Sequence, residues 1–553
     1  MQLDRKPRSR RTRVATFGLM LGVAATLALS ACGSSGSSSG ASGAGGTGAA
    51  GGASGGSTGG GDSNAAQTAT VGGWDFNTLD PGATVGFLGP ELPMVQPLYG
   101  ALFDPPATTG GAYVPDLATG YTYAKDLKSV TITLRAGETF QDGTPFNAAA
   151  IVWNIDRYAG AESPNKQWYA DIAGATATGA DTVTVNFTHP DATFISMLAY
   201  TSGGLFSSPT AFKAAGAAKY GLHAVGAGPF EVSSFTPGQT LSLVPFPKYW
   251  NASKVKLTSL KYVNTPIDAS VAYQDLSSGS IDSLTLGGTS APANVLQQAQ
   301  GNSNLSMVPG PDNLYLFLAL NSASKPFNNP VARQAIAYCT DRNALATAIS
   351  PGFLKPAFVA GGASTLYYPF GGTSGAASAY PYPYNAAKAK ALVQQLGGLN
   401  FNFINFGGLY DTISNALAQS WKACGINAQV STVTGPALEQ AFATGGFQMA
   451  FTVEGGLSSP IFYRSFQQAG TPQGLYTTVP LHSDIPGLVS QVYQTTDTSQ
   501  LQSLFTSLYT DINKEAATIP VVSGPNYSIS GHCVTGINLN GFGANFAFAS
   551  KTC

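Results

Sequence analysis

Charged side chains are scarce in this sequence, since Asp, Glu, Lys and Arg make up 10% of its 553 residues. Lysine and arginine total 27 against 28 acidic residues, so the basic surplus typical of nucleic-acid-binding proteins is missing. The chain has 4 histidines and 5 cysteines, and no Cys-x-x-Cys or Cys/His spacing indicates a zinc site. The sequence therefore predicts no catalytic residue, no metal site and no cofactor.

Long hydrophobic runs are also missing, apart from one run from Val14 to Leu29 that follows a basic stretch between Arg5 and Arg13. This order is that of a secretory signal. The run ends in Leu29-Ser30-Ala31-Cys32, which resembles the lipobox of bacterial lipoproteins. The resemblance implies cleavage after residue 31 and lipidation of Cys32, on the extracytoplasmic face of the cell membrane. The alternatives are a soluble secreted protein and a transmembrane anchor, for which the run is short against roughly 20 residues.

Residues 32–65 consist mainly of Gly, Ser, Ala and Thr, without any charged residue before Asp62. This composition cannot form a core and predicts a disordered tether, whose reach is roughly 5 to 6 Å times the square root of its length. About 30 residues would let a folded body stand roughly 30 Å from the membrane. Without residues 1–31 the chain keeps 21 basic and 27 acidic residues, a net charge of −6.

The cysteines that follow the tether are Cys339, Cys424, Cys533 and Cys553. An exported chain can form disulfides, and four cysteines allow three pairings. We favour Cys533 with Cys553, because both lie in the last segment and would fix the C-terminal tail. Cys339 and Cys424 then form either a second disulfide or two buried free thiols.

The folded body, from about residue 66, is too long for one simple core and is expected to form two or three lobes. Val130–Leu134 alternates as a strand, Gln141-Asp142-Gly143 has the composition of a turn, and Asn147 is suited to cap the next helix. Each block alone is a weak signal, whereas the order of many blocks is specific. In chain order these blocks include Leu79-Asp80-Pro81, Gly226-Ala227-Gly228-Pro229-Phe230, Tyr249-Trp250, Ser280-Ile281-Asp282, Val331–Arg342 and Tyr382-Pro383-Tyr384-Asn385.

Taken in order, the blocks resemble the family of extracytoplasmic solute-binding proteins that serve ABC importers of oligopeptides, dipeptides and nickel (family 5). The resemblance implies an α/β fold with two lobes, of the periplasmic-binding-protein type (class II, cluster C), and a ligand cleft between the lobes. Its partners would be ABC permease subunits with cytoplasmic ATPases, and the protein would act as a monomer. The implied divisions are a signal peptide 1–31, a tether 32–65, lobe I segments 66–97 and 225–312, a lobe I subdomain 98–224, lobe II 313–519 and a C-terminal return to lobe I 520–553.

The resemblance also implies where a ligand would bind. Trp74, Asp75 and Phe76 occupy a stretch that faces the ligand in relatives, and Phe317 lies in a strand that borders the cleft. Peptide binders of this family hold the ligand's α-ammonium with an aspartate in a block that here contains Thr452-Val453-Glu454-Gly455-Gly456.

The block departs from the family pattern, because Gly456 stands at the position of that aspartate. A buried ammonium without a paired anion costs several kcal/mol, so peptide binding loses its usual anchor. Glu454 lies two residues earlier, on the same strand face. It either takes over the ammonium or is a rim residue that faces solvent.

Two arginines of the helix near Val331 are further candidates for ligand contact. Arg333 and Arg342 either touch a ligand or, as we favour, form surface ion pairs with Asp341 or Asp312. The function predicted overall is a lipid-anchored solute-binding component of an ABC importer that captures a peptide-like or other small organic solute. The alternatives are a surface-tethered envelope hydrolase and a solute receptor for signalling on the same fold.

Overall fold

The computed structural model describes residues 67–73, 77–83, 92–106, 111–160, 163–265, 268–454, 485–516, 518–539 and 543–553. The structural account below concerns the unit Asn64–Cys553. The predicted signal peptide and Cys32 lie outside the described residues, as does the tether. Within the described ranges, no helix has both the length and the apolar character of a membrane span.

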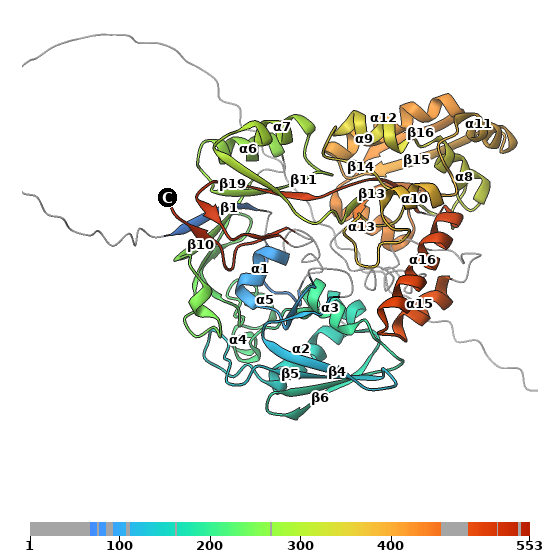
Figure 1. Cartoon of the computed structure of the whole chain (residues 1–553). Helices are drawn as coiled ribbons and strands as arrows, with labels where there is room; N and C mark the ends of the chain where they lie inside the picture. Colours follow the sequence, from blue (N-terminus) through green and yellow to red (C-terminus); the bar gives the residue numbers. More distant parts are fainter. Residues whose placement is uncertain are drawn as a thin grey trace, which may run out of the picture. The chain divides into compact units, whose positions relative to one another are not determined.

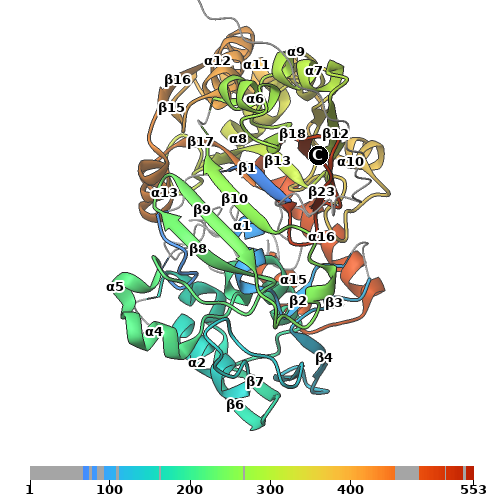
Figure 2. The same ribbon diagram turned by 90° about the vertical axis from the view of Figure 1, so that its left-hand side faces the viewer.

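A seven-stranded mixed sheet collects its strands from three distant parts of the chain. β1 pairs in parallel with both β10 and β11, so the carboxyl ends of these three strands lie at one edge. Figure 2 shows β8, β9 and β10 side by side in this sheet. In spatial order the strands are β12 (Leu305–Pro309), β19 (Asn526–Gly531), β11 (Ser283–Gly287), β1 (Thr68–Gly73), β10 (Ser259–Asn264), β9 (Thr240–Pro245) and β8 (Phe230–Thr236).

The two faces of this sheet bury different apolar clusters, as the alternation of strand residues requires. Leu260 and Tyr262 of β10 belong to the main core, whereas Val263 packs against a smaller cluster. That smaller cluster includes Leu276 and Leu296, from helices α6 (Ala269–Ser277) and α7 (Ala293–Gly301). The helices lie together along one side of the sheet in Figure 1.

A four-stranded antiparallel sheet forms a subdomain, with strands in the order β4 (Ala118–Tyr123), β5 (Ser129–Leu134), β7 (Thr182–Phe187) and β6 (Ile172–Gly179). Helix α2 (Ala148–Ala159) packs on it, and the Ala150 amide donates to Asn147 Oδ1 at 3.1 Å. The predicted strand at Val130 and the predicted helix cap are therefore confirmed. The other described elements between β1 and β10 in the sequence are α1 (Leu92–Tyr99), β2 (Phe103–Asp104), β3 (Val114–Pro115), η1 (Pro164–Tyr169), α3 (Phe194–Tyr200), η2 (Ser202–Gly204), α4 (Pro209–Ala215), α5 (Ala217–Tyr220) and η3 (Ala252–Lys254).

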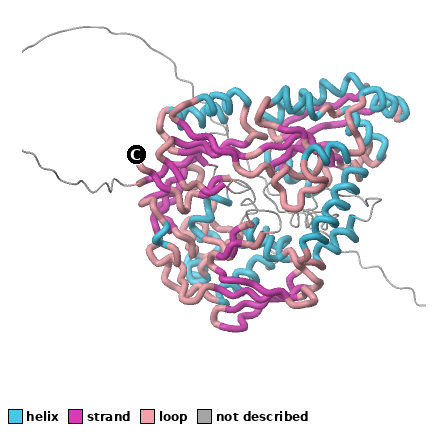
Figure 3. The backbone as a smooth tube through the Cα atoms, viewed as in Figure 1, coloured by secondary structure: helices cyan, strands magenta, loops and turns pink. Residues whose placement is uncertain are grey.

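A six-stranded sheet forms the other large layer, and helices flank its strands (Figure 3). Its strands, in spatial order, are β14 (Lys355–Pro356), β18 (Thr518–Gly524), β13 (Leu314–Leu320), β17 (Met449–Glu454), β15 (Leu399–Asn405) and β16 (Ile426–Thr432). Its helices are α8 (Pro330–Cys339), α9 (Arg342–Ile349), α10 (Thr373–Ala379), α11 (Ala386–Gln395), α12 (Leu409–Trp421), η4 (Lys422–Cys424), α13 (Gly435–Thr444), α15 (Ile485–Tyr493) and α16 (Thr498–Glu515). A buried disulfide between Cys339 and Cys424 joins α8 to η4, so the two free thiols are not found.

The chain passes between the two large sheets twice, from β12 to β13 and from β18 to β19. β18 continues to Gly524 within the six-stranded sheet, beyond the expected lobe boundary at 519. After β19 the tail forms the ribbons β20 (Val534–Thr535) with β23 (Ser550–Lys551) and β21 (Asn538–Leu539) with β22 (Ala544–Asn545). A disulfide joins Cys533 to Cys553 in this tail, the pairing that the sequence favoured.

Candidate ligand-binding site

Strands β13 and β17 bring together several of the predicted ligand contacts. They are antiparallel, with Thr452 opposite Phe317 and Glu454 opposite Tyr315. Phe317 is fully buried, and its ring stacks on that of Tyr315 with centroids 5.1 Å apart. Directly opposite residues share a sheet face, so this register places positions 315, 317 and 452 on one side of the six-stranded sheet.

One edge of β17 is paired over only part of its length. β15 pairs with β17 at Met449 and Ala450, and no described strand pairs with positions 451–454 on that side. A free strand edge offers backbone donors and acceptors to which an extended peptide can add. The geometry of β17 therefore suits a ligand with a peptide-like backbone.

Val453 differs from its neighbours, because its side chain packs against the core cluster that contains Leu316 and Phe451. That cluster lies on the opposite sheet face from Phe317. Only the backbone of Val453 is thus available at the predicted site, and its role stays a prediction.

Five predicted contacts lie outside the described residues: Trp74, Asp75, Phe76, Gly455 and Gly456. The first three directly follow the last residue of β1, and the glycines follow the last residue of β17. Their contacts with a ligand also stay predictions.

The predicted surface ion pairs of two arginines are wrong. Arg333 is buried and pairs with Glu515 at 3.3 Å, while its Nε donates to the Glu515 carbonyl at 2.8 Å. Arg342 is also buried, and it donates to the Pro520 carbonyl at 2.7 Å and to the Tyr380 hydroxyl at 2.6 Å. Both guanidinium groups are thus held inside the protein by residues distant in the sequence, which leaves them no role as surface charges.

Asp312 fixes the passage from β12 to β13 at the border of this site. Its amide donates to Ser364 Oγ at 3.0 Å, and its carbonyl accepts from the Ser364 amide at 2.7 Å. Burial raises the pKa of the Asp312 carboxyl, and Lys355, 3.5 Å away, opposes that rise. A Cβ atom at Gly362 would lie 2.3 Å from the Asp312 carbonyl oxygen, so only glycine fits there.

Sequence reasoning missed an aromatic loop that packs in the same core cluster as Tyr315 and Phe317. Tyr367 and Phe370 have φ angles of 58° and 62°, a left-handed conformation that costs about 1 to 3 kcal/mol for residues other than glycine. Gln502 Nε2 supports the loop by donating to the carbonyls of Tyr367 and Tyr368, each at 3.3 Å. The pairs Gly361-Gly362 and Gly371-Gly372 that flank this loop were the available signal.

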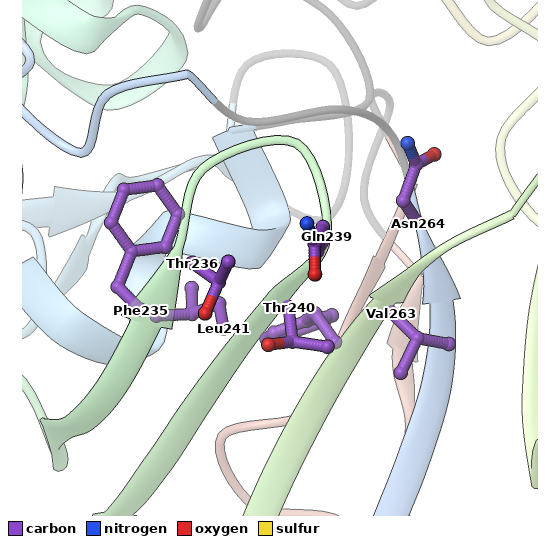
Figure 4. A pocket seen from close by; sticks show the side chains of 8 residues that line it. Phe235, Thr236, Gln239, Thr240, Leu241, Val263 and Asn264 are labelled. Carbon is purple, nitrogen blue, oxygen red and sulfur yellow. The ribbon is translucent and has the colours of Figure 1, made fainter.

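Two hollows lie elsewhere and do not suit a solute. The first, shown in Figure 4, has a volume of about 10 Å³, enough for about one water molecule. It lies at the β8–β9 turn beside β10, lined by Phe235, Thr236, Gln239, Thr240, Leu241, Tyr262, Val263 and Asn264. The second measures about 350 Å³, but its lining on α15 and α16 is polar except for Leu488, whereas small-molecule sites are mostly apolar.

Known proteins with the same fold are numerous. DppA from Helicobacter pylori, solved in complex with the peptide STSA, has a TM-score of 0.74 at 20% identity over 88% of this chain and 99% of that one. NikA from Brucella suis, solved in complex with Fe(III)-EDTA, has a TM-score of 0.75 at 18% identity over 88% and 99%. These similarities confirm the predicted fold class, the two-lobed α/β fold of periplasmic binding proteins.

Sequence comparison supplies the family. The glutathione-binding protein GsiB of Salmonella typhimurium is 31% identical over 284 residues, which are 51% of this chain and 52% of GsiB. The match thus spans about half the length of these curated relatives. Residues 112–472 match the profile of the bacterial extracellular solute-binding proteins, family 5, whose members bind solutes and are not enzymes. The chain belongs to this family, as the order of its sequence blocks predicted.

Proposed function

We propose that the protein is the solute-binding component of an ABC importer and that it captures a peptide-like solute. A lipid on Cys32 holds it on the extracytoplasmic face of the cell membrane, and the loaded protein delivers its ligand to the permease. Family membership supports the binding role, and the GsiB and DppA comparisons favour a ligand with peptide bonds. The single observation that carries the peptide-like class is the edge of β17 at positions 451–454, with which no strand among the described residues pairs on the side of β15.

In this proposal the ligand backbone adds to the free edge of β17. Strand addition supplies affinity through main-chain hydrogen bonds, and nearby side chains select the ligand. Thr452, which is partly buried and lies opposite the fully buried Phe317, contributes one such side chain. Closure of two lobes around the solute then produces a shape that a permease can distinguish from the open form.

A thermal-shift screen of the mature chain tests the ligand class. The panel comprises di- to pentapeptides including glutathione, free amino acids, sugars, polyamines and metal chelates. Because a ligand that binds only the folded state stabilises it, we expect the melting temperature to rise with peptides. A rise with sugars alone would contradict the proposal.

Glu454 is proposed to pair with the ligand's ammonium group, in place of the aspartate that Gly456 replaces. Glu454→Gln should then weaken binding of an amine-bearing peptide roughly tenfold or more, because a charge-assisted contact is lost. The same peptide with an acetylated amine should bind both proteins equally. Glu231→Gln on β8, in the other large sheet, is the matched control. Equal affinities of Glu454→Gln and the unaltered protein for the free amine would refute this role.

The anchor is tested separately in cells. Cys32→Ser should move the protein out of the membrane fraction, since the predicted lipid has no other attachment point. Continued membrane retention in the absence of lipid would favour an uncleaved hydrophobic segment instead.

A further inference from the structure

The segment between β9 and β10 carries an unusual local charge. Lys248, Lys254 and Lys256 lie within nine residues and are all exposed, and no acidic residue occurs between positions 246 and 257. No ion pair involves these three lysines within the described part of the chain. Lys256 Nζ donates to the Ser253 carbonyl at 2.9 Å, which keeps the ammonium close to the backbone. Three positive charges that are close in sequence thus stand out on a mature chain whose net charge is −6.

Two exposed aromatic rings lie beside these lysines. Trp250 and Phe548 are 37% and 40% exposed, and the ring of Tyr249 lies 5.8 Å from the first and 6.5 Å from the second. Trp250 is held rigidly, because its Nε1 donates to Asp116 at 2.8 Å and the Arg135 guanidinium lies 3.7 Å over its ring. We call Lys248, Lys254, Lys256, Trp250 and Phe548 the basic aromatic face.

This face is connected closely to the point where the described chain begins. The Thr258 amide, just after Lys256, donates to the Gln67 carbonyl at 3.2 Å. Lys551, three residues after Phe548, donates through Nζ to the Thr68 carbonyl at 3.1 Å. Figure 1 likewise shows the C-terminus close to the start of β1. In the sequence, the residues before Gln67 lead back to Cys32. The lysine segment and the segment that contains Phe548 are therefore both linked to the point where the predicted tether joins the folded body.

We propose that the basic aromatic face binds the surface of an anionic phospholipid bilayer. The inference rests on the proposed lipid anchor, which would hold this face within reach of the membrane. Lysine charges are attracted to anionic headgroups, and aromatic rings with a polar neighbour suit the interface between headgroups and acyl chains. The acidic remainder of the body is repelled by the same surface. The face therefore orients the tethered body, with the start of β1 and the C-terminal tail towards the membrane.

Vesicle sedimentation of the unlipidated protein tests this directly. The protein is the complete mature chain with Cys32→Ser, mixed at low ionic strength with vesicles of equal parts phosphatidylglycerol and phosphatidylcholine. Each lysine at such a surface contributes about fivefold to partitioning, so three lysines together contribute ~100-fold. We expect binding to the mixed vesicles, none to pure phosphatidylcholine, and loss of binding as salt is added.

Two matched variants separate the face from total charge. Replacing Lys248, Lys254 and Lys256 by Gln should lower partitioning tenfold or more. The control replaces Lys125, Lys219 and Lys390 by Gln, three exposed lysines from other elements, and should leave partitioning nearly unchanged. Circular dichroism and melting of each variant report whether it folds.

Three results would overturn the proposal: no sedimentation with the anionic vesicles, equal binding to both vesicle types, or equal losses of binding in the two triple variants.

Phe548→Ser adds an independent variant, because it leaves every charge in place and should still weaken binding. The result does not depend on lipidation, since no lipid is attached. Membrane fractionation in cells thus tests the lipid anchor, and vesicle sedimentation tests the basic aromatic face, so either proposal can fail without the other.

Discussion

Asp104 allows a sharp prediction about stability and pH. It lies on β2 and is partly buried, and the loss of hydration together with the nearby Asp116 carboxylate raises the pKa of its carboxyl from 3.8 to about 7. Between these values the folded protein keeps the proton and the unfolded chain has lost it. The unfolded state then binds fewer protons, so the free energy of unfolding falls as the pH rises through this window.

The size of this effect follows from the two pKa values. At about 1.4 kcal/mol per pH unit, the interval from 3.8 to about 7 corresponds to about 4 kcal/mol. This is an upper limit, because the side chain keeps some contact with water. Asp104→Asn removes the charge, so it should stabilise the protein by about 1 to 4 kcal/mol at pH ~8 and have little effect near pH ~4.

Urea unfolding of Asp104→Asn and of the unaltered protein, followed across this pH range, measures the difference. Asp156→Asn, at an exposed position on α2, is the control and should show no such pH-dependent gain. A difference between Asp104→Asn and the unaltered protein that stays constant with pH would refute the reasoning. Lower stability of Asp104→Asn at alkaline pH would refute it as well.

Two further predictions concern the links that stabilise the fold. Replacing Cys339 and Cys424 by Ala opens a link between residues 85 positions apart and should lower the free energy of unfolding by about 4 to 5 kcal/mol. The same change at Cys533 and Cys553, 20 positions apart, should cost about 3 kcal/mol, because a disulfide that closes a shorter loop restricts the unfolded chain less. Urea denaturation that shows a larger loss for the Cys533 and Cys553 variant would contradict this reasoning. Arg333→Met should cost about 1 to 3 kcal/mol in the same assay, because the partly buried Glu515 carboxylate and the Glu515 carbonyl lose the donor that they share. A midpoint equal to that of the unaltered protein would show that this ion pair contributes nothing.

Features that depend on neighbouring residues were predictable from the sequence. The strand near Val130 follows from its alternation, and the cap at Asn147 follows from a side-chain oxygen placed just before an apolar helix. The disulfide between Cys533 and Cys553 needed only their closeness in the last segment. The family assignment needed the order of the blocks, which composition alone does not contain.

Features that depend on distant residues were not predictable. Closeness in sequence favours Asp341 or Asp312 as the partner of Arg333, yet the fold supplies Glu515, 182 positions away. The left-handed conformations of Tyr367 and Phe370 oppose the local preference of these residues and depend on tertiary support. Among the described strands, β15 pairs with only two residues of β17, which depends on how the strands are arranged in space.

The central claim is that this protein captures a peptide-like solute and returns it unchanged. Equilibrium dialysis of the mature protein against a labelled peptide identified by thermal shift, with mass spectrometry of the recovered peptide, tests it most directly. The account predicts saturable binding of one peptide per chain, with the peptide recovered intact. Absence of saturable binding across the peptide panel, or recovery of cleaved peptide, would contradict it.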